Sequence, residues 1–396
     1  MKLMSVDAAR AAMLAGVRRL GPVDLPLAEA LGRMLAEDVR AVRDQPPFTN
    51  SSMDGWAVRS AEGAGPRRIA GESAAGHGFE GRLGPGEAVR IFTGAALPDG
   101  ADAVVIQEDA RREGEHVEVP ASAPGDNVRQ AGRDFRAGAR LLTEGLRLDP
   151  WRLSLCASAG RDRVRVVRPP QVSIISTGEE VVEAPALPGP WQIFDSGSPG
   201  LEAMLRSWGA GVRRVTGVRD RRDAAREAIA GAGGDLVVTL GGASVGDHDL
   251  VRAAAAELGL DLRVESVAVR PGKPTFFGVL GDGRPLLGLP GNPASAFVCA
   301  ELFLRPLVAA LEGRPLAPAL RRVRLASPLP ANGPREHWMR ARLGEGAEGE
   351  TVEAFLDQDS SLVRVFSEAD ALLRRLPEAP RAEAGDLVEV LPLVRG

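Results

Sequence analysis

The sequence predicts a multidomain α/β-plus-β protein with a central, doubly wound, mostly parallel α/β domain. Between Val172 and Leu311, strand-like and helix-like patterns alternate about five times, which is typical of a parallel sheet covered on both faces. Short strand patterns separated by glycine turns fill residues 56–135, and similar patterns without a helix of any length fill 316–396. A length of 396 residues fits two to four domains of about 100–200 residues each.

Helical patterns occur before and after the first β-rich region. Ser5 is a candidate N-cap for a helix through residue 20, and apolar residues recur at helical spacing from Leu27 to Leu35 and from Leu148 to Ala159. Together these patterns predict a helical N-terminal linker domain, an inserted β-rich domain, the α/β domain and a small C-terminal β domain resembling a barrel. The predicted bounds are 1–45 with 137–168, then 46–136, 169–312 and 316–396.

The composition excludes several classes of protein. The net charge is −4 and the charged residues are intermixed, so a broad nucleic-acid-binding face is not expected. Cys156 and Cys299 lie in apolar surroundings without ligand spacing, which indicates buried free thiols in a reducing compartment. No segment approaches membrane-spanning length and residues 1–12 lack a signal-peptide pattern, so we expect a cytoplasmic protein without membrane contact.

A glycine loop after a buried strand gives the first indication of a binding site. Leu236 to Leu240 is a β-branched run that ends at Gly241-Gly242, and a helical pattern begins at Leu250. Backbone N–H groups at such a junction favour an anion, and glycine allows a close approach. Asp247 and Asp249 would add carboxylates, which beside phosphate usually means Mg²⁺. The alternative is an ordinary βα turn with an Asp cap.

Two further loops strengthen the prediction of an anion site. Arg270-Pro-Gly-Lys273-Pro follows the strand-like run Val264 to Val269. Pro290-Gly-Asn-Pro-Ala-Ser295 follows Pro285 to Leu289 and opens a helical pattern. Because ligands gather at the carboxyl ends of strands in open α/β sheets, three such loops predict a site for a polyanion.

Polar loops in the β-rich region allow two interpretations. The proline-broken segment 44–59 is rich in hydrogen-bonding side chains, which suits either a functional loop or ordinary turns. Arg129 and Asp134 could serve a site or form a surface ion pair of little energetic value.

Six motifs in order resemble the molybdopterin molybdenumtransferases, a family that includes the E domain of gephyrin. The likeness extends from about residue 5 to 396, and six ordered motifs are far more specific than one. The motifs are Asn50-Ser-Ser-Met-Asp-Gly-Trp-Ala57, Phe92-Thr-Gly94, Ser176-Thr-Gly-Glu-Glu180, Gly241-Gly-Ala-Ser-Val-Gly246, Pro271-Gly-Lys-Pro274 and Leu289-Pro-Gly-Asn-Pro293.

The resemblance implies an enzyme of molybdenum cofactor biosynthesis. Members insert molybdenum from molybdate into adenylylated molybdopterin with Mg²⁺ and release AMP. The resemblance also implies a molybdopterin-binding fold for residues 169–312 and a homodimer of four-domain subunits. In such a dimer the cleft lies between the α/β domain of one subunit and the inserted domain of the other. Transient contacts with the adenylyltransferase and with recipient molybdoenzymes are expected.

Carried onto this sequence, the resemblance assigns roles to individual residues. Asp54 and Thr93 would reach in from the partner subunit, and Arg270, Lys273, Ser295 and an arginine of the 335–340 segment would hold molybdate. The expected catalytic residues are Asp54, Thr93, Glu180, Asp220, Asp249 and Lys273, and the expected metal ligands are Asp247, Asp249 and Glu180. The expected binding residues are Arg129, Asp134, Ser176, Thr177, Gly178, Asp195, Gly241, Gly242, Ser244, Gly246, Arg270, Pro290, Gly291, Asn292, Ser295, Arg335 and Arg340.

Departures from the family pattern keep other functions open. Arg270 stands where Lys is common, Gly197 where Asn is usual, Arg133 where an acidic residue is common, and Asp359-Ser-Ser361 replaces a Gly-Ser turn. These changes allow a divergent paralogue that binds molybdopterin as a scaffold or prefers another metal oxyanion such as tungstate. The related adenylyltransferase is another alternative, but it has only the domain that resembles residues 170–312.

Overall fold

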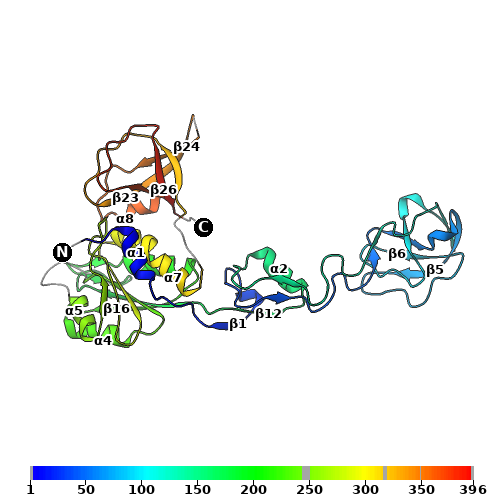
Figure 1. Ribbon diagram of the computed structural model, residues 1–396, viewed down its shortest axis with the longest axis horizontal. Coiled ribbons are helices and arrows are strands. Elements are labelled where there is room, and N and C mark those ends of the chain that lie inside the picture. Colours follow the sequence, from blue (N-terminus) through cyan, green and yellow to red (C-terminus); the bar gives the residue numbers. More distant parts are fainter. Residues whose placement is uncertain (1–2, 243–249, 315–318, 348, 394–396) are drawn as a thin grey trace. The chain divides into compact units, whose positions relative to one another are not determined.

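The computed structural model describes residues 3–242, 250–314, 319–347 and 349–393 (Figure 1). The chain divides into two compact units, Met1–Val23 with Val167–Gly396, and Asp24–Val166. Each unit is described by itself. Ser244, Gly246, Asp247 and Asp249, which the sequence analysis placed in the site, lie outside the described residues.

The first unit contains the predicted doubly wound sheet. Its first four strands run parallel and the last two pairings are antiparallel, which confirms a mostly parallel α/β domain. The strand Leu236–Leu240 occupies a central position and is buried along its whole length. In spatial order the strands are β16 (Gly211–Val218), β13 (Gln171–Thr177), β17 (Leu236–Leu240), β21 (Pro285–Leu289), β20 (Phe276–Val279) and β18 (Asp261–Val264).

Alternate residues of the sheet strands enter two separate cores. Val238 of β17 packs in a core with helices α1 (Val6–Leu14), α3 (Gly197–Ser207) and the helical segment 293–311. Its neighbour Val237 packs on the other face with α4 (Arg222–Gly231) and α5 (Leu250–Glu257). The side-chain alternation of a strand therefore buries helices on both faces. As predicted, Ser5 caps α1, accepting a hydrogen bond of 3.3 Å from the backbone N–H of Ala8.

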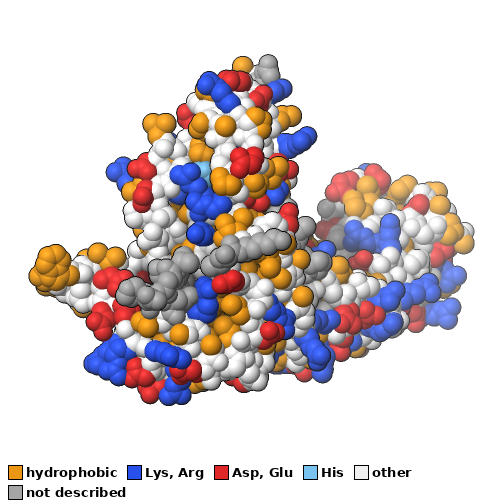
Figure 2. Space-filling view, turned by 60° about the vertical axis from the view of Figure 1, so that its left-hand side comes forward, with side chains coloured by type: hydrophobic (Ala, Val, Ile, Leu, Met, Phe, Trp, Pro, Cys, Tyr) orange, Lys and Arg blue, Asp and Glu red, His pale blue; other side chains and the backbone are white. Residues whose placement is uncertain are grey.

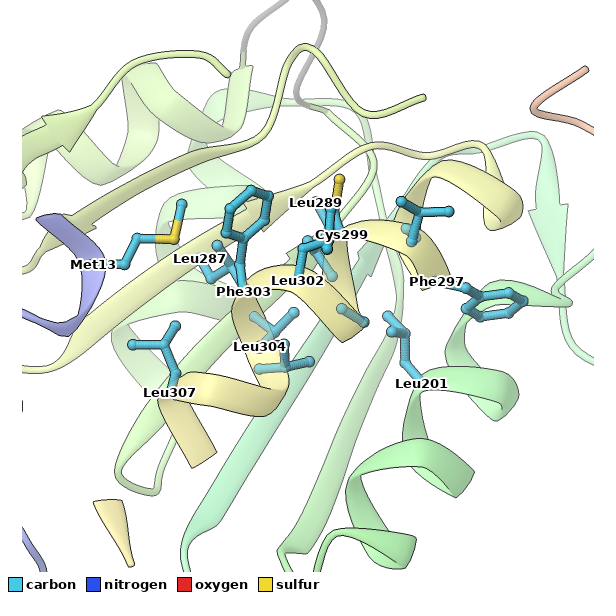
Figure 3. Packing of buried hydrophobic residues seen from close by; sticks show 14 of the residues in the cluster. Met13, Leu201, Leu287, Leu289, Phe297, Cys299, Leu302, Phe303, Leu304 and Leu307 are labelled. Atoms are coloured by element: carbon cyan, nitrogen blue, oxygen red, sulfur yellow. The ribbon is translucent and has the colours of Figure 1, made fainter. Parts of the chain in front are cut away.

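A long apolar helix fills the first core. It comprises α6 (Pro293–Cys299), the π-helical turn η4 (Ala300–Leu304) and α7 (Arg305–Leu311). Its apolar side chains pack in one cluster with Leu287 and Leu289 of β21, Met13 of α1 and Leu201 of α3 (Figure 3). By length and composition its 19 residues could cross a membrane, so the prediction that no segment approaches membrane-spanning length was wrong. However, 89% of it is buried inside the protein, as expected for a core helix.

The C-terminal region forms a closed five-stranded barrel, in agreement with the predicted barrel-like domain. The strands pair in a ring because β23 contacts both β24 and β25 (Figure 1). In order around the ring they are β23 (Glu336–Gly346), β24 (Gly349–Ala354), β22 (Arg321–Leu325), β26 (Leu387–Pro392) and β25 (Ala371–Arg375). The expectation of no helix here was wrong, because α8 (Val363–Glu368) is a short α-helix. Its Phe366 packs against the apolar core of the α/β domain.

The predicted strand Val264 to Val269 was also wrong. In the structure β18 ends at Val264, and a separate strand β19 (Val269–Arg270) leaves the α/β sheet. β19 pairs in parallel with β23 of the barrel, with Arg270 opposite His337. The cationic loop after Arg270 therefore starts from the barrel's sheet rather than from a strand end of the α/β sheet.

The second unit contains the predicted all-β region. A six-stranded sheet has the order β7 (Ala103–Ile106), β4 (Gly55–Val58), β6 (Glu87–Ile91), β5 (Gly65–Ser73), β9 (His116–Val119) and β8 (Arg111–Glu113). The ribbons β2 (Val39–Arg40) with β11 (Arg140–Leu142) and β3 (Asn50–Ser51) with β10 (Val128–Arg129) accompany it, as does α2 (Pro150–Ser158). Strands β1 (Pro22–Pro26) and β12 (Arg163–Val167) form another pair.

The helix predicted from Leu27 to Leu35 is wrong. Only a 3₁₀ turn, Leu27–Glu29, forms there. Gly32 has a φ of 75°, a left-handed conformation that interrupts a right-handed helix. Met34 and Leu35 instead form isolated bridges with Arg147 and Val166.

Candidate functional site

A carboxylate-lined pocket lies at the carboxyl ends of β13, β17 and β21, and we call it the acidic pocket. Its volume is about 640 Å³, and its described lining includes three carboxylates and no Lys or Arg. The structure thus brings together two of the three loops predicted to form an anion site, and the third contributes Pro274. Predicted site residues in the lining are Ser176, Thr177, Gly178, Glu180, Asp195, Asp220, Gly241, Gly242, Pro290, Gly291 and Asn292.

Glycines shape the wall of the acidic pocket. Gly242 has a φ of 62°, and a Cβ there would lie 2.4 Å from Val251 Cγ2. Gly241 has a φ of 88°, and a Cβ there would lie 2.8 Å from the carbonyl oxygen of Thr177. The Oγ1 atom of Thr177 is buried and has no hydrogen-bond partner among the described residues. A buried hydroxyl without a partner beside an open pocket suits a polar ligand.

The three carboxylates of the acidic pocket are held by different elements. Asp220 follows β16 and accepts a 3.2 Å hydrogen bond from the backbone N–H of Glu179. Asp195 accepts a 2.9 Å bond from the backbone N–H of Ser198 in the first turn of α3. Glu180 is exposed in the loop after β13. Among the described residues no three acidic, His or Cys side chains converge closely enough to cage a metal. Mg²⁺ commonly keeps several waters and needs only one or two carboxylates, so hard oxygen donors of this kind fit it.

A second pocket, which we call the cationic pocket, adjoins the first within the same unit. Its volume is about 770 Å³, and Pro274, Pro290 and Asn292 line both pockets. Figure 2 shows Lys and Arg side chains gathered on the upright C-terminal lobe. The basic residues in the pocket lining are Arg270, Lys273, Arg335, His337 and Arg375, and Ser295 also contributes.

Close packing fixes the loop that carries Lys273. Gly272 has a φ of 116°, and a Cβ there would lie 2.1 Å from Cys299 Sγ, so only glycine fits. Thr275 Oγ1 donates a 2.8 Å hydrogen bond to the carbonyl of Gly272 and lies 3.1 Å from the same sulfur. Burial raises the pKa of the Cys299 thiol to about 12, so the thiol packs under the loop as an inert group. Cys156 is also a buried free thiol, as predicted.

Lys273 is unusual for this chain. It is one of only two lysines, the other being Lys2, among 49 basic residues. It makes no ion pair with a described residue, and neither do Arg270 and Arg335. The chain uses arginine at nearly every other basic position, but it has a lysine, with its compact ammonium group, in this pocket. Lys273, Arg270 and Arg335 repel one another there, and a bound anion would offset this repulsion.

The two arginines of the 335–340 segment have different positions. Arg335 lines the cationic pocket, and its Nη1 donates to the carbonyl of Val269 at 3.4 Å. Arg340 is fully buried behind the loop 357–361, and its Nη2 donates to the carbonyl of Asp359 at 2.7 Å. The Nε and Nη1 atoms of Arg340 have no partner among the described residues.

The Asp359-Ser-Ser361 turn joins the barrel to the α/β sheet. Ser360 Oγ accepts a 2.8 Å hydrogen bond from Nδ2 of Asn292, and Ser361 lines the acidic pocket. The side chain and backbone N–H of Ser361 bond to the Asp359 carboxylate and lower its pKa. The departure from a Gly-Ser turn therefore still places hydroxyl groups beside both pockets.

Two basic residues of the cationic pocket, His337 and Arg375, were not predicted from the sequence. His337 is 6% exposed, and its Nε2 has no hydrogen-bond partner among the described residues. Burial, and to a smaller degree the charges of three arginines, lowers the pKa of His337 to about 4. These arginines are Arg270, Arg340 and Arg335. Alternate residues of a strand share a face, so Arg335, directly before β23, lies on the same side as His337 and Met339, and this spacing could have revealed the histidine.

Replacing His337 with phenylalanine is expected to reduce the acid sensitivity of the fold. The unfolded imidazole has a pKa near 6.5, so between pH 6.5 and about 4 the unfolded chain binds a proton that the folded chain excludes. Lowering the pH through this window therefore favours unfolding. From pH 7.5 to pH 5 the native protein should lose about 2 kcal/mol more stability than the variant. Urea unfolding at several pH values measures this difference, and parallel pH profiles would contradict it.

In the second unit the side chains of Asp54 and Thr93 are in contact. Oδ1 of Asp54 accepts hydrogen bonds from the backbone N–H and the hydroxyl of Thr93, at 2.7 and 2.8 Å. These bonds, the backbone one first, lower the pKa of Asp54 and keep its carboxylate charged. Arg90 lies nearby, stacked 4.8 Å from the ring centroid of Phe92.

Arg129 and Asp134 are both exposed. Arg129 lies opposite Asn50 in the β3–β10 ribbon, and the backbone N–H of Asp134 bonds to the carbonyl of Gln45. The interpretation of the two as a surface ion pair is wrong, because within the described ranges their side chains form no ion pair with each other.

Comparison with known proteins covers almost the whole chain. Residues 4–160 match the MoeA N-terminal region (domains I and II), 173–310 a probable molybdopterin-binding domain, and 322–393 the MoeA C-terminal region (domain IV). The "Molybdopterin molybdenumtransferase" of Nostoc sp. is 37% identical over 326 residues, covering 78% of this chain and 74% of the relative. That of Bacillus subtilis is 35% identical over 385 residues, covering 92% of this chain and 88% of the relative.

A solved structure agrees with these matches. The molybdopterin biosynthesis MoeA protein of Pyrococcus horikosii superposes with a TM-score of 0.85 at 30% identity, covering 99% of both chains. Sequence, family models and fold thus agree over the full length. The chain belongs to the molybdopterin molybdenumtransferase (MoeA) family of molybdenum cofactor biosynthesis.

Proposed function

We propose that the protein inserts molybdenum from molybdate into adenylylated molybdopterin in a Mg²⁺-dependent reaction that releases AMP. The observation that supports this best is the pair of adjoining pockets, which share Pro274, Pro290 and Asn292. In the cationic pocket Lys273 and three arginines outnumber two carboxylates, Asp357 and Asp359, whereas the acidic pocket has three carboxylates and no Lys or Arg among its described lining residues. One pocket suits a small oxyanion and the other a pyrophosphate with its cation. A substrate spanning the shared wall would present its dithiolene to molybdate and its phosphoanhydride to the carboxylates.

The cationic pocket would hold molybdate through charge and hydrogen bonds. Lys273 offers three N–H donors without a preferred plane, which suits a tetrahedral oxyanion, and Arg270 and Arg335 add guanidinium donors. Ser295, buried at the start of α6, adds a hydroxyl. This arrangement gathers several basic side chains at one pocket of a chain whose net charge is −4. Molybdate here is a substrate, held where the dithiolene sulfurs can reach it.

The acidic pocket would hold the pyrophosphate and Mg²⁺. Glu180 and Asp220 are its described candidates for holding the ion, with Asp247 and Asp249 proposed from the sequence alone. When bound, Mg²⁺ offsets charge on the phosphoryl oxygens. The glycines at 178, 241, 242 and 291 let the pyrophosphate approach the backbone closely. Hydrolysis of the phosphoanhydride there would consume one water and leave AMP and molybdopterin, which keeps its own phosphate group.

The proposal includes a homodimer in the cytoplasm. Asp54 and Thr93 of one subunit, with Arg129 and Asp134, would complete the pockets of its partner. The hydrogen-bonded Asp54–Thr93 pair supports this, because the two bonds from Thr93 hold a charged carboxylate in a fixed position. Both bonds go to the same oxygen, Oδ1. The four-domain division predicted from the sequence, and transient contacts with the adenylyltransferase and recipient molybdoenzymes, belong to the same proposal.

An AMP-release assay tests the proposed function. Purified protein with adenylylated molybdopterin, Mg²⁺ and molybdate should release AMP, and omission of molybdate or Mg²⁺ should prevent or slow the release. Arg111→Ala, which removes an exposed ion pair with Glu113 in the second unit, serves as a matched control with unchanged turnover. Tight nucleotide retention without turnover would instead identify a scaffold, and synthesis of the adenylylated compound from ATP would identify an adenylyltransferase.

A further inference from the structure

Three side chains form a row across the wall of the cationic pocket. Along the ladder between β19, β23 and β25, His337 lies opposite Arg270 on one side and opposite Arg375 on the other. Residues directly opposite each other in adjacent strands project to the same face of a sheet. All three line the cationic pocket. The row therefore places an imidazole between two guanidinium groups, facing the space proposed for the oxyanion.

The imidazole in this row is buried without a partner. His337 is 6% exposed, and its Nε2 has no hydrogen-bond partner among the described residues. A buried polar atom left unpaired costs about 1–3 kcal/mol, so native proteins usually supply a protein, water or ligand partner. The pocket of about 770 Å³ beside it has room for such a ligand.

The charges around the row favour an anion and a neutral imidazole. Arg375 is 8% exposed and donates from Nη2 to the carbonyls of Pro330 and Pro380, which fixes its position. Other charged groups near His337 are Arg335 directly before β23 and Arg340 on β23 itself. Lys273 of the loop after β19, and Asp357 and Asp359 of the loop after β24, line the same pocket. With its pKa lowered to about 4, His337 is neutral at pH 7 and offers a directional N–H without adding to the repulsion between cations.

We propose that His337 contacts the substrate oxyanion, donating a hydrogen bond from Nε2–H to one oxygen of molybdate. The proposal rests on the function proposed above and adds a residue that contributes to affinity and orientation. The Arg270–His337–Arg375 row would bind one edge of the tetrahedron while Lys273 binds another. The charged donors Arg270 and Arg375 on the two sides and the neutral donor His337 between them would fix the orientation of the anion. Point charges alone would not fix it, because they have no directional preference.

The test compares molybdate binding by His337→Gln and His337→Phe in the full-length protein. The side-chain amide of Gln can place an N–H near the position of Nε2, whereas Phe keeps a ring but has no donor. Isothermal titration with sodium molybdate should show a Kd within about threefold of the native value for His337→Gln. For His337→Phe the Kd should rise about 10- to 100-fold, as expected for loss of a hydrogen bond to a charged group. Thermal unfolding checks that both variants fold.

The outcomes separate this inference from the proposed function. Native protein that binds molybdate, with His337→Phe binding equally well, overturns the contact while leaving the function intact. Native protein that does not bind molybdate overturns both. If His337→Phe does not fold, His337→Asn replaces it, because its shorter amide reaches only the position of Nδ1. Equal affinity of the Asn and Gln variants would then reject Nε2 as the donor.

Discussion

Replacing Lys273 with alanine is expected to raise the molybdate concentration needed for half-maximal AMP release about 100-fold. The ammonium group lies in the cationic pocket without a carboxylate partner among the described residues. Loss of one hydrogen-bonded charge contact to a dianion of this kind corresponds to about 2–3 kcal/mol of binding free energy. Nucleotide binding should change little, because Lys273 is absent from the acidic pocket lining. Initial rates over a molybdate series measure the effect.

Lys273→Arg is the matched control for this prediction. It keeps the charge in a chain that uses arginine at nearly every other basic position. Its planar donors fit a tetrahedral oxyanion less freely, so we expect an intermediate defect of about tenfold. An unchanged molybdate dependence in Lys273→Ala would remove this residue from the oxyanion site.

The double replacement Glu180→Gln and Asp220→Asn is expected to lower the rate of AMP release by about 100- to 1000-fold. This is the range typical of the loss of preorganised electrostatic stabilisation in an active site. Both carboxylates line the acidic pocket, and neither lines the cationic one. The amides keep the size of the side chains but remove the charge that would hold Mg²⁺. Single-turnover measurements over a Mg²⁺ series should show a higher Mg²⁺ requirement.

Molybdate affinity provides the internal control for the acidic pocket. The double variant should bind molybdate as the native protein does, whereas Lys273→Ala should not. Unimpaired AMP release by the double variant would show that these two carboxylates play no part in the reaction. Weakened molybdate binding in the double variant would show that the two pockets do not act separately.

Much of the fold could be predicted because its signals are local. The strand Leu236–Leu240 and the strand Pro285–Leu289 have the predicted bounds. The failures arose where distant pairing decides the structure. The run Val264 to Val269 looks like one strand, but Val269 and Arg270 pair with Glu336 and His337 of β23, which lie far along the chain, and no local pattern indicates that register. Closure of the barrel through β23 and β25 is non-local in the same way.

The site follows the same division. The loops containing Gly241, Lys273 and Gly291 were predicted because glycine and charge after a strand are visible in sequence. His337 and Arg375 were missed because their roles depend on lying opposite each other across strands. The composition also pointed to this site, because Lys273 is one of only two lysines in 396 residues, and this rarity was not used in the prediction.

Crystals soaked in molybdate test the central claim of two adjoining pockets most directly. Anomalous diffraction near the molybdenum edge should show one strong peak bounded by Arg270, Lys273 and Arg335, within hydrogen-bonding distance of His337 Nε2. A second soak with AMP and Mg²⁺ should place phosphate density beside Glu180 and Asp220. A molybdenum peak in the acidic pocket, or elsewhere on the protein with the cationic pocket empty, would contradict the account.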